Sequence, residues 1–96
     1  MKVITRNPGH DGVKSHDWVL LEHEGRKLKI TYEAGNAYER CNTDLFDGDK
    51  WNHLLSLEDI GFNVDYKIYV SDPPIRKKRA DTLFEAHKKE IFNILK

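Results

Sequence analysis

Apolar residues occupy every second position of 28–32, with a lysine and a threonine between them. This alternation is the pattern of a β-strand with one buried face. A short apolar run at 18–21 precedes it, and the turn-forming pair Glu24-Gly25 lies between the two. The pattern therefore predicts a β-hairpin whose second strand is half buried. A further turn is expected at residues 34–36.

Three more segments are predicted to be strands. Residues 62–70 alternate strictly between apolar and polar positions, which indicates a strand with one wet face. Residues 1–5 are expected to form a first strand with Val3 facing inward. Residues 38–46 are rich in polar side chains, which favours a strand at the edge of the sheet. The turn formers at 7–12 predict a loop.

The C-terminal segment has helical periodicity from about Ile75 to Leu95. With residues placed at 100° intervals, its apolar side chains and one histidine fall within an arc of about 120°. These residues are Ala80, Leu83, Phe84, His87, Ile91, Ile94 and Leu95. Laid across a sheet, this face of the helix closes a hydrophobic core, and His87 is then expected to be a core histidine with a hydrogen-bond partner.

The segment 47–61 fits two structures. It opens with Asp47-Gly48, a hairpin signal that would let the following residues continue the sheet. Alternatively, the tryptophan and the leucines that follow form one face of a helix ending at Gly61. Residues 56–59 also have the spacing of a capping box on a single late turn. We expect a short helix between residues 50 and 61.

Together these elements predict one α+β domain over residues 1–96. Its architecture is a small antiparallel or mixed sheet of roughly four to five strands, with the long C-terminal amphipathic helix packed on one face. A chain of 96 residues has the size for one core. It has little room for a deep ligand pocket of several hundred cubic ångströms as well, which argues against a metabolic enzyme.

The composition is that of a folded intracellular domain. The net charge is zero and ten residues are aromatic, whereas disordered chains combine low hydrophobicity with high net charge. The lone Cys41 excludes an internal disulfide and a multi-cysteine zinc site, and it is expected to be half buried and unreactive. The sequence shows neither a signal-peptide pattern nor an apolar run of about 20 residues. We expect a soluble cytoplasmic protein with no membrane partner.

Charge is distributed unevenly along the chain. Residues 39–66 carry seven carboxylates and two cations, and residues 67–96 carry eight cations and four carboxylates. The strongest local feature is a basic cluster of four adjacent cations: Arg76, Lys77, Lys78 and Arg79. Such a cluster can neutralise phosphates, dock an acidic protein surface, or simply be a solvated flank.

The basic cluster conflicts with the helix that follows it. On the helical wheel Arg76 and Lys77 share the arc of the apolar side chains. Cations near a helix start also oppose the helix dipole. Thr82 and Glu85 have the spacing of a capping box, so the packed helix could instead begin at Thr82. The basic cluster would then be an exposed loop.

The acidic candidates are Asp44, Asp47 and Asp49. Their spacing and the position of Gly48 depart from the EF-hand pattern, so calcium binding is not expected. Turn formation and capping explain these residues adequately. They are also candidate residues for contact with a protein partner.

Two His-Asp pairs, His10-Asp11 and His16-Asp17, lie six residues apart near the N-terminus. Imidazole and carboxylate groups bind metals and act in acid–base catalysis. Nothing in this spacing defines a coordination geometry, so a small metal-dependent hydrolase is only a third hypothesis. We expect no metal and no cofactor, since no phosphate-binding loop or nucleophile motif is present.

By elimination, the leading hypothesis is a small non-enzymatic protein that modulates a larger macromolecular partner by protein–protein contact. Inhibitors, adaptors and accessory subunits, including those encoded by phages and mobile elements, are typical of this class. The contacts would involve the basic cluster, the acidic residues, or both. The alternative is an RNA- or DNA-binding module that uses the basic cluster, although four cations on a neutral chain are few for that role.

Overall fold

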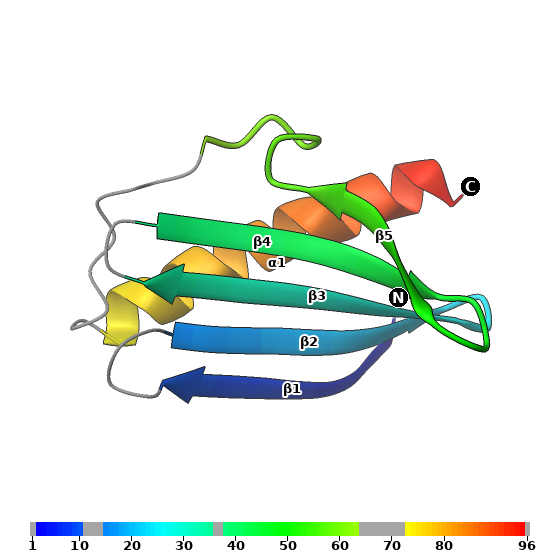
Figure 1. Cartoon of the computed structure of the whole chain (residues 1–96), viewed down its shortest axis with the longest axis horizontal. Helices are drawn as coiled ribbons and strands as arrows, with labels where there is room; N and C mark the ends of the chain where they lie inside the picture. Colours follow the sequence, from blue (N-terminus) through cyan, green and yellow to red (C-terminus); the bar gives the residue numbers. More distant parts are fainter. Residues whose placement is uncertain (1, 11–14, 36–37, 64–72, 96) are drawn as a thin grey trace.

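The computed structural model describes residues 2–10, 15–35, 38–63 and 73–95. Five strands follow one another in chain order and form an antiparallel sheet with the order β1-β2-β3-β4-β5 (Figure 1). One long helix, α1, follows the sheet. The bounds are β1 Lys2–His10, β2 Ser15–His23, β3 Arg26–Gly35, β4 Tyr38–Phe46, β5 Trp51–Ser56 and α1 Pro73–Ile94. The predicted α+β class is therefore confirmed.

The predicted hairpin is formed by β2 and β3. Glu24 and Gly25 both have positive φ angles, 52° and 78°, which is the conformation of a type I′ turn. This turn places Leu21 opposite Leu28 and Val19 opposite Ile30, so the apolar residues of both strands share one face. The alternation seen in the sequence thus becomes the buried face of the sheet.

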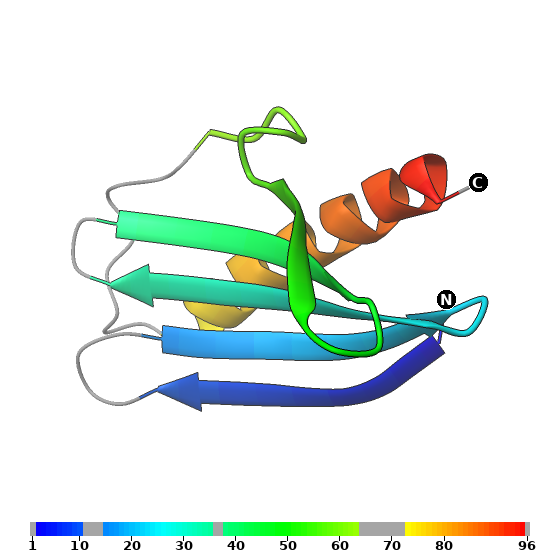
Figure 2. The same cartoon turned by 45° about the vertical axis from the view of Figure 1, so that its right-hand side comes forward.

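Helix α1 covers that face and closes the core. The helix lies behind the strands in Figures 1 and 2, starting behind β2 and β3 and rising towards the β5 side. Its oblique course leaves β1 at the margin of the covered area. Most of the predicted apolar stripe is buried, but Ile94 is half exposed. The buried members of this stripe are Ala80, Leu83, Phe84, His87 and Ile91.

The predicted helix between residues 50 and 61 is wrong. Asp47 accepts backbone hydrogen bonds from Asp49 and Lys50, and Gly48 takes a φ of 96°, so the chain reverses tightly. It then runs back along β4 as β5, with Leu55 buried. A single turn follows, capped as the spacing of 56–59 predicted, with the Asp59 carboxylate accepting from the backbone and hydroxyl of Ser56. Here pairing with β4 outweighs the helical pattern.

Several strand limits also differ from the predictions. β4 lies inside the sheet, between β3 and β5, and is not an edge strand. β1 extends through the predicted loop at 7–12 as far as His10, which Pro8 permits because β1 is itself an edge strand. β3 likewise runs through Ala34 and Gly35; the Tyr38 ring fills the place where a Cβ on Gly35 would lie.

Two further predictions concern residues 62–70 and the position of Val3. The strand predicted at 62–70 lies largely outside the described residues; Phe62, which is described, belongs to no strand and packs partly buried against the core. Val3 lies in β1 opposite Leu21, but it is 51% exposed and not buried as predicted. The reason is the oblique course of α1, which leaves the first residues of β1 without a cover.

Candidate functional site

The structure divides the basic cluster between the interior and the surface. α1 begins at Pro73, so the cluster is helical and is not a loop preceding a helix at Thr82. Arg76 is buried, with 4% of its surface exposed, whereas Lys77 and Lys78 are exposed. Lys77 forms an ion pair with Asp81 one turn later. Of the four cations, then, the two lysines are exposed, Arg79 is partly exposed and Arg76 is buried.

Arg79 is held inside a polar network with β4. Its guanidinium donates two hydrogen bonds to the Glu39 carboxylate, from Nε at 2.9 Å and from Nη2 at 3.0 Å. Glu39 has no exposed side-chain surface, and it also accepts a hydrogen bond from the Tyr32 hydroxyl at 2.9 Å. Burial and the Glu39 charge together raise the pKa of Tyr32, so its hydroxyl stays protonated and remains a donor. This network joins the start of α1 to the sheet.

A second charged network joins α1 to β1. Arg6 binds Asp17 on β2 through two hydrogen bonds, at 2.7 and 3.3 Å, and forms an ion pair with Asp81 on the helix. Burial alone would raise the pKa of Asp81, but the hydrogen bonds from Arg6 and Lys77 outweigh it and hold the pKa below its usual value. Asp81 is therefore charged at neutral pH. The ion pairs fasten α1 on both flanks, to β1 on one side and to β4 on the other.

The acidic candidates lie at the opposite end of the sheet. Asp47 closes the β4–β5 hairpin through the backbone of Asp49 and Lys50, and hydrogen bonds from this backbone and from Asn52 lower the pKa of its carboxyl. Asp44 lies 3.8 Å from His53 on the neighbouring strand, and Asp49 is exposed. In Figure 1 this hairpin and the start of α1 are at opposite ends of the molecule. The structure therefore does not bring the acidic and basic candidates into one site.

The His-Asp pairs do not converge either. The side chains of His10 and Asp11 lie outside the described residues. Asp17 faces α1 and is bound by Arg6, whereas His16 belongs to the opposite face of β2 and lies 3.9 Å from Glu33. Within the described ranges, no group of three or more histidine, cysteine or acidic side chains is arranged to hold a metal ion.

His87 and Cys41 are interior residues. For His87 this confirms the prediction from the sequence. The His87 ring is fully buried, and its Nδ1 lies 2.6 Å from the Thr43 hydroxyl. Burial lowers the pKa of His87 to about 4, and burial followed by the Glu39 charge raises the pKa of Cys41. The histidine is therefore neutral and the thiol protonated near pH 7. Neither group is available for acid–base or nucleophilic chemistry.

The buried histidine predicts a pH dependence of stability. Because the pKa of His87 is lower in the folded state than the usual 6.5, the unfolded chain binds the proton more tightly. The stability that this residue contributes is thus present above pH 6.5 and is lost as the pH falls towards 4. We expect the free energy of unfolding, measured with urea, to fall less over this pH window in H87Q than in the wild-type protein. The control is N93Q, an exposed and non-titrating position on the same helix, which should leave the pH dependence of stability as in the wild-type protein.

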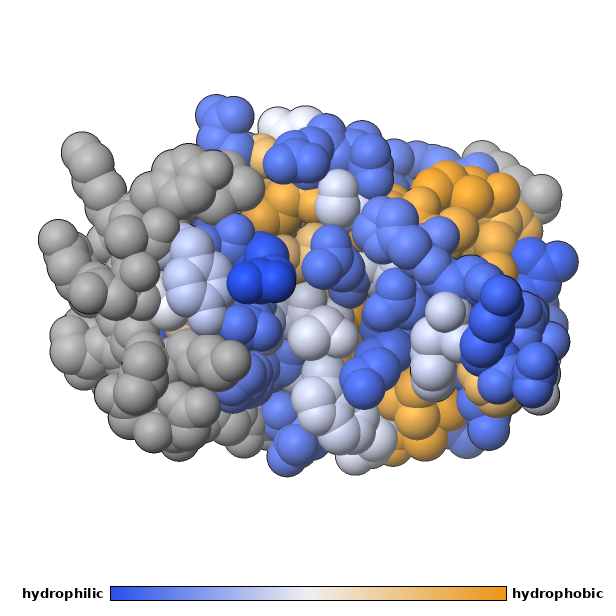
Figure 3. Space-filling view, in the orientation of Figure 1, coloured by the Kyte–Doolittle hydropathy of each residue, from blue (hydrophilic) through white to orange (hydrophobic). Residues whose placement is uncertain are grey.

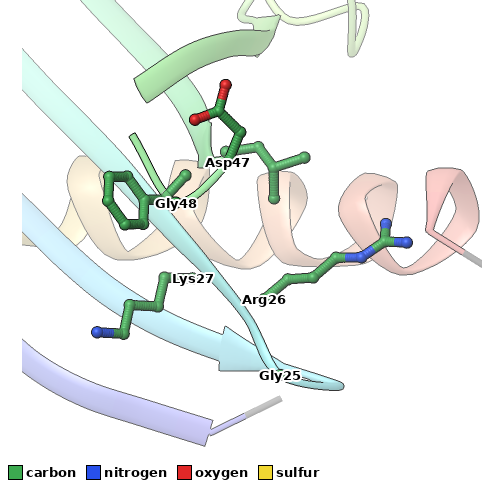
Figure 4. A pocket seen from close by; sticks show the side chains of 7 residues that line it. Gly25, Arg26, Lys27, Asp47 and Gly48 are labelled. Atoms are coloured by element: carbon green, nitrogen blue, oxygen red, sulfur yellow. The ribbon is translucent and has the colours of Figure 1, made fainter. Parts of the chain in front are cut away.

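An open depression lies between the β2–β3 and β4–β5 hairpins, with a volume of about 520 Å³. Figure 4 shows the side chains around it: Arg26 and Lys27 extend in different directions, and Asp47 points away from both. The Asp47 oxygens are already engaged by the turn. These side chains do not converge on a common point, so the depression lacks the arrangement of a catalytic or ligand site.

The face of the sheet opposite α1 is mainly hydrophilic. Figure 3 shows polar surface over its middle, with hydrophobic surface confined to separate patches towards the periphery. Its charges oppose one another across neighbouring strands, which stabilises the sheet and balances the surface. The pairs are Glu22 with Lys27, Lys29 with Asp44, and Glu33 with Arg40. The described residues of this face form neither a strongly basic nor a continuous apolar surface.

The exposed apolar residues gather elsewhere. Val3, Ile4, Phe92 and Ile94 are each about half exposed, and we call these four residues the apolar end. In both Figure 1 and Figure 2 the beginning of β1 and the end of α1 lie at the same end of the molecule. The Phe92 ring contacts the ring of His23, at the end of the strand that pairs with Val3. Val3 and Phe92 therefore both lie beside the end of β2.

A groove continues from the apolar end along β1. Val3, Val19 and Phe84 form its apolar lining, and it has an open volume of about 470 Å³. Its polar rim is made of Arg6, Asp81, Glu85 and Lys88. The last two also border the shallow depression around Phe92, so the two hollows adjoin. We call them together the β1–α1 groove.

Sequence reasoning did not find the β1–α1 groove. Val3 was expected to face inward, and the groove exists only because α1 crosses the sheet obliquely. One signal was available: Phe92 falls outside the apolar arc of the helix, so its ring had no predicted place in the core. A large aromatic side chain outside the buried face is a feature of interaction surfaces.

Among the described residues, no helix is long and apolar enough to cross a membrane. Similarity to known proteins gives no further guidance. No protein-family model matches the chain, and no curated protein and no solved structure is significantly similar to it.

Proposed function

We propose that this protein is a non-enzymatic binding protein that modulates a larger protein by direct contact. The observation that carries the proposal is the apolar end. Four of the six large apolar side chains exposed among the described residues lie at the start of β1 or the end of α1. Exposed apolar groups that gather in one place, rimmed by charged residues, are typical of protein–protein interaction sites.

Several polar residues in the described interior also support the proposal, because they form hydrogen bonds with one another. Glu39, Arg79 and Tyr32 hydrogen-bond to one another, as do Arg6 and Asp17. A catalytic group has to be within reach of a substrate, whereas these groups join the helix to the sheet. Their role is therefore best explained as structural.

Nucleic-acid binding has less support than protein binding. Backbone phosphates are neutralised by cations that are accessible to them. Arg76 is buried and Arg79 is committed to Glu39, so half of the basic cluster is engaged within the fold. The charges of the open sheet face are balanced across its strands.

The test is capture of a partner with two matched variants. F92D places a charge in the apolar end, and I75D places the same charge on a comparably exposed apolar residue near the other end of α1. With the tagged protein in extracts of the source cell, we expect one protein species retained by the wild type and by I75D, and reduced at least tenfold by F92D. Both variants should keep the wild-type melting temperature, since both sites are exposed.

Two outcomes would contradict the proposal. One is that nothing is retained specifically by the wild-type protein. The other is that only nucleic acid is retained and that its retention falls with K77Q/K78Q, which would favour the nucleic-acid alternative.

A further inference from the structure

Arg76 is buried at the start of α1 without a counter-ion. Only 4% of its surface is exposed, and its Nη1 atom is buried and makes no hydrogen bond. Arg79, one turn later, binds Glu39. Among the residues that the structure describes, by contrast, no carboxylate lies within ion-pair distance of Arg76. A buried charge without a partner is strongly unfavourable, so this guanidinium is suited to bind an anion.

Helical periodicity places Arg76 in the interior. It precedes Ala80, Leu83 and His87 by four, seven and eleven positions, a spacing that puts all four residues on one face of a helix. All of them are buried on the side of α1 that covers the sheet. The methylene groups of an arginine can pack in such a position, but its guanidinium remains charged at any pH the fold survives.

The side chain of Arg76 extends towards the N-terminal end of α1. In an α-helix each Cα–Cβ bond tilts towards the N-terminus, and long side chains lie back over the preceding turn. Arg76 is the fourth residue of α1, which begins at Pro73, so the preceding turn is the first turn of the helix. The guanidinium therefore lies at the end where the helix dipole is positive.

No acidic side chain in the first turn offsets this positive charge. Lys77 and Lys78 follow Arg76 directly, and the nearest carboxylate along α1, that of Asp81, is engaged by Lys77 and by Arg6. A helix N-terminus is a favourable place for an oxyanion, and a guanidinium binds oxyanions through two parallel hydrogen bonds. The start of α1 combines both features.

We propose that Arg76 and the N-terminal end of α1 bind a small oxyanion of the phosphate class. The guanidinium takes two oxygens of one anion. A tetrahedral phosphate keeps further oxygens for the positive end of the helix, whereas a carboxylate has only two oxygens in all.

The burial of Arg76 limits the size of the anion. With 4% of the residue exposed, neither a nucleic-acid backbone nor a folded protein surface reaches the guanidinium, whereas a free ion is small enough to enter. Helix ends fray, and the first turn of α1 can open to admit the ion. In Figure 1 the start of α1 is at the opposite end of the molecule from the apolar end, so this site is separate from the proposed protein-binding surface.

Thermal unfolding in different salts tests the proposal. The wild-type protein is compared in sodium chloride, sodium acetate and sodium phosphate at one pH and one ionic strength. With a dissociation constant of about 1 mM, about 20 mM phosphate should raise the melting temperature by about 5 °C or more relative to chloride. Acetate should raise it by less than about half as much.

Two matched variants locate the site. R76M keeps an unbranched side chain and removes its charge, and its melting temperature should respond to phosphate by less than about 1 °C. K78M makes the same kind of change at an exposed lysine two positions later and should keep the wild-type response. A second readout is the Nε resonance of Arg76, assigned by its absence in R76M, which should shift when phosphate is titrated into the wild-type protein.

The same variants measure the cost of the buried charge in chloride alone. R76M should melt no lower than the wild-type protein, because it removes a buried charge that has no partner in the fold. R79Q breaks an ion pair and should melt well below both.

Each contrary outcome overturns a specific part of the proposal. If phosphate has no effect beyond that of chloride, or if R76M responds like the wild type, no oxyanion binds at Arg76. If K78M also loses the response, phosphate acts through exposed cations. If R76M in chloride melts as low as R79Q, Arg76 already has a partner within the fold, and an equal effect of acetate overturns the phosphate class. Capture of a partner protein through Phe92 is decided separately, by F92D.

Discussion

A chain that ends at Arg79 is expected to lose cooperative folding altogether. The deletion removes Leu83, Phe84 and Ile91 from the core together with the buried His87. Each large apolar side chain contributes about 1.5–3 kcal/mol when buried, and the sheet face beneath them would become exposed as well. The lost burial free energy is therefore comparable to a typical free energy of unfolding, about 5–15 kcal/mol. Thermal unfolding followed by circular dichroism should show no sigmoidal transition.

A chain that ends at Ile94 is the matched control. It lacks only the last two residues, of which Leu95 is partly buried against the core. We expect this control to keep a cooperative transition with a slightly lower midpoint. A sharp transition in the chain that ends at Arg79 would mean that the sheet has another cover, and the packing of α1 described above would be wrong.

The second large effect is expected for R79Q. Glu39 has no exposed side-chain surface, and R79Q removes the cation that donates two hydrogen bonds to its buried carboxylate. Removing one member of a buried ion pair costs about 3–5 kcal/mol. We expect the free energy of unfolding in urea to fall by about this amount. K78Q, which alters the adjacent exposed lysine, should change it by less than about 0.5 kcal/mol.

A double-mutant cycle isolates the interaction energy between Arg79 and Glu39 from the other effects of each substitution. E39Q removes the buried charge. Adding R79Q to the E39Q variant should therefore lower the free energy of unfolding much less than R79Q does in the wild-type chain. If R79Q and K78Q have equal effects, or if the cycle shows no coupling, Arg79 is a surface cation and becomes available again for a partner. The same data therefore decide whether the basic cluster acts as one unit.

The β5 segment shows why a local pattern can mislead. Trp51, Leu54 and Leu55 fit one face of a helix, yet the residues pair with β4 because Asp47-Gly48 reverses the chain just before them. A six-residue segment has little helical stability of its own, so the tertiary contact decides. The capping signal of residues 56–59 was nonetheless right, since it depends only on neighbours within one turn.

The basic cluster illustrates a second limit. Its four cations are adjacent in sequence, but a helix turns each of them by about 100° from the last. Arg76 enters the interior, Arg79 meets Glu39 across 40 positions of the chain, and the two lysines face solvent. Nothing local distinguishes the arginines from the lysines in this respect. The buried carboxylate that holds Arg79 comes from another strand.

The amino-acid sequence by itself determined those features that depend on neighbours a few residues apart. The β2–β3 hairpin, with its alternating apolar positions and its Glu24-Gly25 turn, is one, and the long amphipathic helix is another. Only the tertiary structure decided the place of each strand in the sheet, the burial of the charged networks and the β1–α1 groove. The order of the strands depends on the pairing of whole strands, and the charged networks and the groove depend on how α1 crosses the sheet. Both involve contacts between residues far apart in the chain.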